Sequence, residues 1–179
     1  RSSAASDVYK RQEYTQAIGS RWLTSAVARI MRPGCKADHI LILEGSEGLR
    51  KSTAFKALAG EEYFSDALPS IDKPDAAMYL AGRWIIEMAE LHAIRRSEMA
   101  SINAFITRTT DILRKPYERR VNDTPRQCIF GGTVNPPFNL PDEDGARRFW
   151  FVPVVSCDAD AIARDREQIW AEAVRRYRS

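Results

Sequence analysis

One stretch constrains the fold of this chain more than any other: residues 40–59, "ILILEGSEGLRKSTAFKALA". The apolar run at residues 39–43 has no polar alternation, which is typical of a parallel strand buried on both faces. The composition of residues 51–59 favours a helix that ends at Gly60. A strand, a glycine-bearing loop and a helix are therefore expected to follow one another directly.

The loop between this strand and this helix nearly matches the pattern G-x-x-x-x-G-K-[ST]. Its glycines allow positive φ angles and close approach of a ligand to the backbone. Successive N–H groups of such a loop, assisted by the helix dipole, bind the oxygens of a triphosphate. A lysine would reach the outer phosphates, and the serine after it would place its hydroxyl on Mg²⁺. The predicted phosphate-binding residues are Gly45, Ser46, Glu47, Gly48, Leu49, Arg50, Lys51, Ser52 and Thr53. The simpler alternative is a glycine-containing turn before an ordinary helix.

Arg50 stands where the pattern has its second glycine. A non-glycine residue at positive φ costs on the order of 1 kcal/mol or more, and a bulky side chain is expected to crowd the loop. Together these effects would weaken nucleotide affinity by roughly one to two orders of magnitude. Two explanations fit: a read error that converts one glycine codon, or a genuine site that is tolerated or decayed.

Polar residues follow two further predicted strands. In "RWIIEMAEL" we assign Glu87 to metal binding and Glu90 to polarising water, with the order of the two left open. Solvated glutamates at a strand end are the alternative. In "GGTVN" Asn135, with Thr133 nearby, is expected to orient the attacking water; otherwise Asn135 is a turn residue before Pro136. Glu87, Glu90 and Asn135 are therefore candidate catalytic residues together with Lys51.

Positive charge gathers in two places, within a chain of net charge +3. The pair Arg147 and Arg148 precedes a predicted strand, where an arginine could enter the nucleotide site of a neighbouring subunit. Residues 111–125 are expected to form a hairpin that follows a nucleic-acid backbone. Its candidate contact residues are Arg114, Lys115, Tyr117, Arg119 and Arg120. A solvated charged face is the alternative for both groups.

The whole pattern predicts an α/β fold with a largely parallel sheet flanked by helices. Further strands are expected within residues 83–91, 126–135 and 147–155, and further helices at 14–31, 75–82, 96–109 and 158–177. We interpret residues 1–12 as a non-native leader and residues 13–179 as a single domain, truncated at both ends. No apolar run approaches the roughly 18 to 20 residues of a membrane span, and no secretion segment is recognisable, so we interpret the chain as cytoplasmic.

The quoted segments, in this order, resemble the virulence-associated protein E-like P-loop ATPases of phages and integrated elements. These are related to superfamily 3 helicases and poxvirus-type primase-helicases. The match includes "RPGCKADHILILEGSEGLRKST", "WIIEMAEL", "FITRTTDILRKPYERR", "PRQCIFGGTVN", "GARRFW" and "WAEAVRRY". The resemblance implies a P-loop NTPase-like domain that uses ATP and Mg²⁺, acts on DNA, single-stranded or at a replication fork, and assembles into a homo-oligomeric ring. It also implies that Arg147 or Arg148 is the arginine acting in trans.

One departure from the family divides the functional hypotheses. The family loop reads G-x-G-K-S-T, and this chain has Arg50 in place of the last glycine. The leading hypothesis is an ATP-hydrolysing motor domain of a DNA replication protein. The alternative is a module that binds nucleotide or DNA without hydrolysis. A small-molecule P-loop kinase is disfavoured, because the sequence has no recognisable lid or acceptor pocket.

Overall fold

A five-stranded parallel sheet forms the centre of the computed structural model, which describes residues 2–68, 71, 74–88, 91, 96–113, 122–136 and 147–179. The strand order is β2-β3-β6-β1-β7, and neighbouring strands are parallel throughout. The strands are β1 (Ile40–Glu44), β2 (Phe64–Ser65), β3 (Ile85–Met88), β6 (Ile129–Val134) and β7 (Phe149–Pro153). Because all of them run the same way, their carboxyl ends meet at one edge, where ligands of open α/β sheets bind. The predicted α/β fold class is confirmed.

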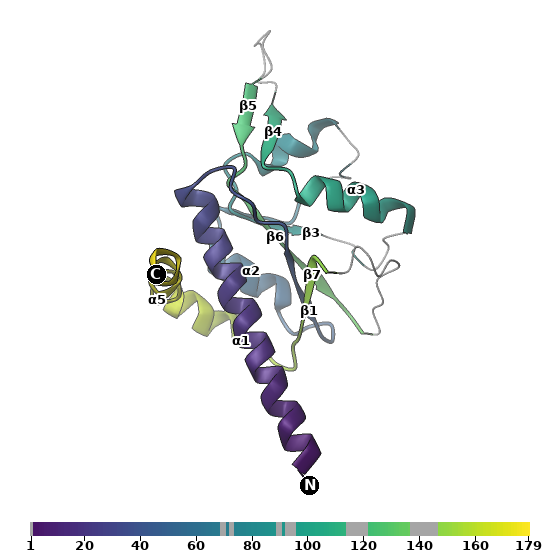
Figure 1. Ribbon diagram of the computed structural model, residues 1–179, viewed down its shortest axis with the longest axis vertical. Helices are drawn as coiled ribbons and strands as arrows, with labels where there is room; N and C mark the ends of the chain where they lie inside the picture. Colours follow the sequence, from purple (N-terminus) through teal and green to yellow (C-terminus); the bar gives the residue numbers. More distant parts are fainter. Residues whose placement is uncertain are drawn as a thin grey trace.

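Helices cover both faces of the sheet (Figure 1). The helices are α1 (Ser2–Met31), α2 (Lys51–Ala59), the 3-10 helix η1 (Pro74–Leu80), α3 (Arg96–Ile106) and α5 (Ala159–Arg178). Helices α1 and α2 pack on one face, η1 and α3 on the other, and α5 packs against α1 and α2. The strand pleat explains this division, since Ile40 and Ile42 of β1 pack with α3 while Leu41 packs with α1 and α2.

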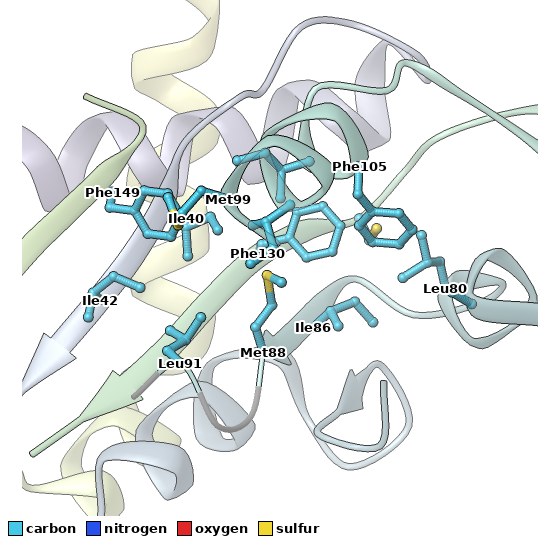
Figure 2. Packing of buried hydrophobic residues seen from close by; sticks show 14 of the residues in the cluster. Ile40, Ile42, Leu80, Ile86, Met88, Leu91, Met99, Phe105, Phe130 and Phe149 are labelled. Atoms are coloured by element: carbon cyan, nitrogen blue, oxygen red, sulfur yellow. The ribbon is translucent and has the colours of Figure 1, made fainter. Parts of the chain in front are cut away.

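The larger hydrophobic cluster lies between the sheet and α3 (Figure 2). Ile86 of β3 and Phe130 of β6 meet Met99 and Phe105 of α3 there, and all four are almost completely buried. This cluster fixes the relative positions of β3 and β6, because both strands present large side chains to the same helix. The two strands whose ends carry predicted catalytic residues are therefore held rigidly side by side.

The opposite face of the sheet is joined to α1 by Trp22. Its side chain is 1% exposed, and its ring lies 5.6 Å from that of Phe55 in α2. The indole N–H donates a hydrogen bond of 2.9 Å to the carbonyl of Phe130. Trp22 therefore satisfies its polar atom inside the core while it fastens α1 to the central strand β6.

Two consecutive glycines of β6 allow this close packing on both faces. A Cβ atom added to Gly131 would lie 2.6 Å from the ring of Phe55, and one added to Gly132 would lie 2.2 Å from Leu91. Real Cβ atoms do not approach other atoms so closely. Glycine in a strand interior often marks such close contacts. Gly131 lets α2 lie directly against one face of the sheet, which places the start of α2 near the strand ends, and Gly132 makes room for Leu91 on the other face.

A two-stranded antiparallel hairpin, β4 (Thr110–Leu113) and β5 (Asn122–Pro125), extends from the sheet beside α3 (Figure 1). Its base is held by Arg126, whose Nε donates a hydrogen bond of 2.7 Å to Asp111 and whose NH1 donates one of 2.6 Å to the Phe105 carbonyl. The side chains of Arg126 and Asp111 are 0% and 5% exposed. A buried ion pair with this many hydrogen bonds fixes the direction in which the hairpin leaves the domain.

Most predicted elements are present, with three differences. The first helix begins at Ser2 rather than at Tyr14, because residues 2–13 contain no glycine or proline that would end it. The segment predicted as a helix at residues 75–82 is 3-10 helical in Pro74–Leu80. Strand β2 was not predicted, since two residues are too few to produce a periodic pattern. In the described residues, no helix is long and apolar enough to span a membrane.

Candidate functional site

The loop between β1 and α2 is shaped by a glycine at each end of its first turn. The N–H of Gly45 donates to the Val134 carbonyl at 3.1 Å, and a Cβ at this position would lie 2.4 Å from the Val154 carbonyl oxygen. Gly48 adopts φ 82°, and a Cβ there would meet open space. Of the two glycines only Gly48 has positive φ; Gly45 is required because the backbone of the neighbouring strand exit leaves no room for a side chain.

Arg50 has the backbone conformation that the missing glycine would adopt. Its φ of 59° and ψ of 31° are left-handed, and it is the one non-glycine residue with positive φ among the residues described. Its side chain leaves the loop and forms hydrogen bonds of 2.8 and 2.9 Å to Asp160. The expectation that a bulky residue would crowd the loop is therefore wrong for this conformation, because α5 provides an acceptor outside it. The hydrogen bond raises the pKa of Arg50 and lowers that of Asp160.

The start of α2 presents backbone donors that the helix itself does not use. Ala54 N–H makes the first helical hydrogen bond, to the Arg50 carbonyl at 3.0 Å, so the N–H groups of residues 51–53 have no acceptor within the helix. The Arg50 side chain makes no capping hydrogen bond to them. Backbone donors not used by the helix, combined with the positive end of its dipole, suit an anionic ligand.

Lys51 folds back over the loop that precedes it. Its ammonium group donates to the carbonyl oxygens of Gly45 at 2.5 Å and Ser46 at 2.7 Å, and to the side-chain oxygen of Asn135 at 3.1 Å. The residue is 7% exposed, so its charge lies within the site rather than in bulk solvent. The structure therefore brings together the lysine and the asparagine that sequence reasoning assigned to one site.

Glu87 contacts the first turn of α2 through Ser52, and only one of its oxygens has a partner among the residues described. Ser52 and Thr133 each donate a hydrogen bond of 2.8 Å to its Oε1. Oε2 is buried and has no hydrogen-bond partner among the described residues. Since Glu87 pairs in register with Gly131, Thr133 lies two residues further along the same face of β6. A buried oxygen of this kind is costly without a partner, so it suits a ligand that completes the site.

These groups border one cavity of about 650 Å³. Pockets of this order hold small-molecule ligands and cofactors. The lining residues are Glu47, Gly48, Leu49, Arg50, Lys51, Ser52, Thr53, Asp66, Glu87, Thr133, Val134 and Asn135. Asp66 was missed by sequence reasoning, because it follows the unpredicted strand β2. The register Ser65 to Ile86 places Asp66 beside Glu87 at the same edge of the sheet.

Two other predicted residues, Arg147 and Arg148, do not line this cavity. Arg147 and Arg148 precede β7, whose first residue pairs with the first residue of β1, so they lie at the opposite edge of the sheet. Five strand steps of roughly 3.3 Å separate Ile40, at that edge, from Gly45 at the start of the loop, a distance of about 17 Å. Outside the described residues lie Glu90 and the hairpin residues Arg114, Lys115, Tyr117, Arg119 and Arg120.

A parallel sheet, a glycine-bearing loop with lysine and serine at the start of the next helix, and a carboxylate at the end of β3 define a P-loop-like α/β domain. The chain belongs to the virulence-associated protein E-like domain family, whose model matches residues 3–179.

Comparison with solved structures supports the same fold. Two apo structures of the NrS-1 C-terminal region match with TM-scores of 0.56 and 0.58, each at 17% sequence identity. They are matched over 89% and 88% of this chain, which spans 41% of each of those chains. No curated protein sequence matches this one significantly.

Proposed function

We propose that this chain is the ATP-binding and ATP-hydrolysing motor domain of a phage or mobile-element DNA replication protein, related to superfamily 3 helicases. One observation carries the proposal: the start of α2, Lys51, Glu87 and Asn135 border one cavity at the carboxyl edge of a parallel sheet. Phosphoryl transfer needs this set, because it depends on positioned donors and charges around the phosphates.

The phosphates of ATP would bind the free N–H groups of residues 51–53 and the ammonium of Lys51. Lys51 now donates to two backbone carbonyls. Charged phosphate oxygens are stronger acceptors than neutral carbonyls. We therefore expect Lys51 to exchange a carbonyl of Gly45 or Ser46 for a phosphate oxygen while it keeps its contact with Asn135.

Ser52 and Glu87 fit a magnesium ion that the phosphates also bind. Their oxygens lie 2.8 Å apart, and Glu87 Oε2 has no partner among the described residues. Mg²⁺ prefers one or two carboxylates together with phosphate oxygens and water. When bound, Mg²⁺ supplies positive charge that stabilises the negative charge on the phosphates. Thr133 would keep the Glu87 carboxylate oriented, since its hydroxyl holds Oε1.

Activation of the attacking water would fall to a carboxylate and an amide. Glu90 is proposed as the group that polarises water, and Asn135 as the group that orients it. Glu87 would take the role of Glu90 if the order of the two is reversed. Asn135 is exposed and lines the cavity, so its amide would be available to orient a water bound there with the nucleotide.

A neighbouring subunit would complete the site. Arg147 and Arg148 lie at the sheet edge opposite the cavity of their own chain, and Arg147 is exposed. We propose that one of them projects into the nucleotide site of the next copy in a homo-oligomeric ring, where it would stabilise transition-state charge. Mixing Lys51→Ala chains with Arg147→Ala or Arg148→Ala chains tests this, because a shared site recovers turnover in the mixture.

DNA, single-stranded or at a replication fork, is the proposed partner of the hairpin. The buried pair Arg126 and Asp111 fixes the hairpin base, and the sequence between β4 and β5 contains four basic residues, among them Arg114 and Arg120. A cluster of basic residues between two strands in the sequence suits contacts with phosphates. Charge removal at Arg119 and Arg120 is expected to weaken DNA binding and to lower its dependence on salt.

The deciding experiment is ATP turnover with and without single-stranded DNA, measured for the native chain, Arg50→Gly and Lys51→Ala. We expect DNA-stimulated turnover in the first two proteins and none in the third. Turnover that is equal in Lys51→Ala would overturn the proposal. ATP binding without turnover in both the native chain and Arg50→Gly would favour a non-hydrolysing nucleotide-binding module.

A further inference from the structure

We infer that Asp160, in the first turn of α5, is a positioning residue for the phosphate loop, because it holds Arg50 in the left-handed conformation from which α2 starts. The inference rests on the proposed function, since the loop is taken to bind ATP. It assigns a role to the residue that departs from the family loop and to a helix outside the cavity.

The backbone at Arg50 needs a source of support that a glycine would not need. Left-handed φ of 59° is unfavourable for a residue with a Cβ atom. The Arg50 side chain does not cap α2, so it contributes nothing to the helix through that route. Such conformations persist only where surrounding contacts determine them.

Asp160 supplies that contact through both of its oxygens. The two nitrogens NH1 and NH2 of Arg50 donate to Oδ2 and Oδ1 of Asp160 at 2.8 and 2.9 Å. A paired arrangement of this kind fixes the plane of the guanidinium as well as its position. A second contact reaches the same residue, since Cys157 Sγ lies 3.8 Å from the Arg50 carbonyl.

Helix α5 can hold Asp160 in a fixed position, because other contacts attach α5 to α2 and order its first turn. The indole N–H of Trp170 donates a hydrogen bond of 2.9 Å to the Leu58 carbonyl, near the end of α2. The first turn of α5 is itself capped, since Asp158 accepts from the Ala161 N–H at 2.9 Å. The turn that carries Asp160 is therefore ordered by its own cap, and α5 is joined to the carboxyl end of α2 independently of Arg50.

The ion pair of Arg50 and Asp160 is exposed, so its effect on the loop should weaken as salt concentration rises. The side chains of Arg50 and Asp160 are 48% and 80% exposed. Exposed ion pairs are screened strongly as ionic strength rises. Many such pairs have no measurable effect. The inference therefore requires that replacement of Asp160 lower MgATP affinity when residue 50 is arginine and leave it unchanged when residue 50 is glycine.

A double-mutant cycle separates these possibilities. MgATP affinity is measured at low salt for the native chain, Asp160→Asn, Arg50→Gly and the double variant. Asp160→Asn is expected to weaken binding by roughly two- to five-fold in the native background. In the Arg50→Gly background it is expected to have almost no effect, since glycine adopts positive φ freely. Asp160→Glu should recover part of the affinity, and high salt should remove the difference between native chain and Asp160→Asn.

Asp165→Asn is the matched control, because Asp165 forms an exposed pair of 2.9 Å with Arg164 on the same helix. It should leave MgATP affinity unchanged. An equal effect of Asp160→Asn in both backgrounds, or no effect in the native one, overturns the inference.

Hydrogen exchange of the peptide spanning residues 44–52, measured without nucleotide, keeps this result distinct from the proposed function. The positioning role is supported if this peptide exchanges faster in Asp160→Asn than in the native chain, and equally fast in the double variant and in Arg50→Gly. This holds even if no protein binds ATP. Failure of all four proteins to bind ATP would then count against the proposed function alone. Unchanged exchange in Asp160→Asn would count against the positioning role itself.

Discussion

The ammonium group of Lys51 lies 3.1 Å from the side-chain oxygen of Asn135 and donates a hydrogen bond to it. This contact joins the first residue of α2 to the residue that follows β6. Each residue was identified from a different motif, and 84 positions separate them in the chain. If Lys51 changed its hydrogen-bond partners on nucleotide binding, the position of Asn135 at the end of β6 would therefore change with it.

Replacement of Lys51 by alanine is expected to weaken MgATP binding by roughly tenfold or more, because a hydrogen bond to a charged group contributes about 1.5–3 kcal/mol. Isothermal titration calorimetry measures this affinity directly. Lys56→Ala is the matched control. Lys56 lies on the same helix but outside the cavity, and its ammonium group pairs with Glu61 at a distance of 2.8 Å. Equal affinity in the native chain and Lys51→Ala would contradict the assigned phosphate contact.

Replacement of Gly132 by alanine is expected to destabilise the domain by about 1–3 kcal/mol, since overpacking forces core side chains and backbone to shift. The added Cβ would lie 2.2 Å from Leu91 and 3.0 Å from Ile42. Urea unfolding followed by circular dichroism gives the free energy of unfolding. Gly19→Ala should instead stabilise the protein by roughly 0.5–1 kcal/mol, because Gly19 is helical and a Cβ there meets no atom within 4 Å. Loss of stability in both variants would contradict the packing argument.

Local patterns were sufficient to predict the strand, loop and helix around the phosphate loop. The continuous apolar run before Gly45 and the helix-forming run after Arg50 are encoded in neighbouring residues, so propensity and periodicity detect them. The same holds for Glu87, which directly follows two buried isoleucines of β3. The link between Glu87 and Thr133 could not be predicted, because it depends on β3 lying next to β6 in the sheet.

The direction of the Arg50 side chain could not be predicted from neighbouring residues either. It is set by Asp160, which lies 110 positions away and reaches Arg50 only because α5 packs beside α2. Strand β2 and the cavity residue Asp66 were missed for a related reason. The pairing of Phe64 and Ser65 with β3 is determined by the neighbouring strand rather than by the composition of the pair itself.

Replacement of Asp111 by alanine is expected to lower the free energy of unfolding by about 3–5 kcal/mol, because it leaves the buried charge of Arg126 without its partner. Arg126 is 2% exposed and also contacts the rings of Phe105 and Phe130 at 4.9 and 5.4 Å from their centroids. Chemical denaturation measures the change. Asp123→Ala, in the exposed strand β5, should change stability by no more than about 0.5 kcal/mol. Similar losses in the two variants would argue against a structural role for the buried pair.

Cys128 should resist alkylation in the native protein at pH 8. Burial raises the pKa of its thiol to about 12, so the reactive thiolate is scarce until the pH approaches that value. Cys35 and Cys157 are partly exposed and should react before Cys128. Mass spectrometry after brief iodoacetamide treatment, with and without urea, identifies the modified positions. Modification of Cys128 without unfolding would show that this part of the core opens in the native state.

Replacement of Glu87 by glutamine is expected to lower ATP turnover by roughly 10²–10⁴-fold while MgATP still binds. Glutamine keeps an oxygen for the hydrogen bonds from Ser52 and Thr133, so the cavity should keep its shape. It removes the negative charge beside the phosphates, and with it the group that would hold Mg²⁺ or accept a proton.

Turnover and MgATP affinity are measured together for Glu87→Gln and for Glu61→Gln, whose exposed carboxylate pairs with Lys56 outside the cavity. Glu61→Gln should match the native chain in both quantities. If Glu87→Gln hydrolyses ATP at the native rate, a different carboxylate holds Mg²⁺ or accepts the proton. Asp66 or Glu90 is then the residue to replace next. A large fall in turnover with preserved affinity ties the chemistry to the buried oxygen of Glu87, because only its charge has changed.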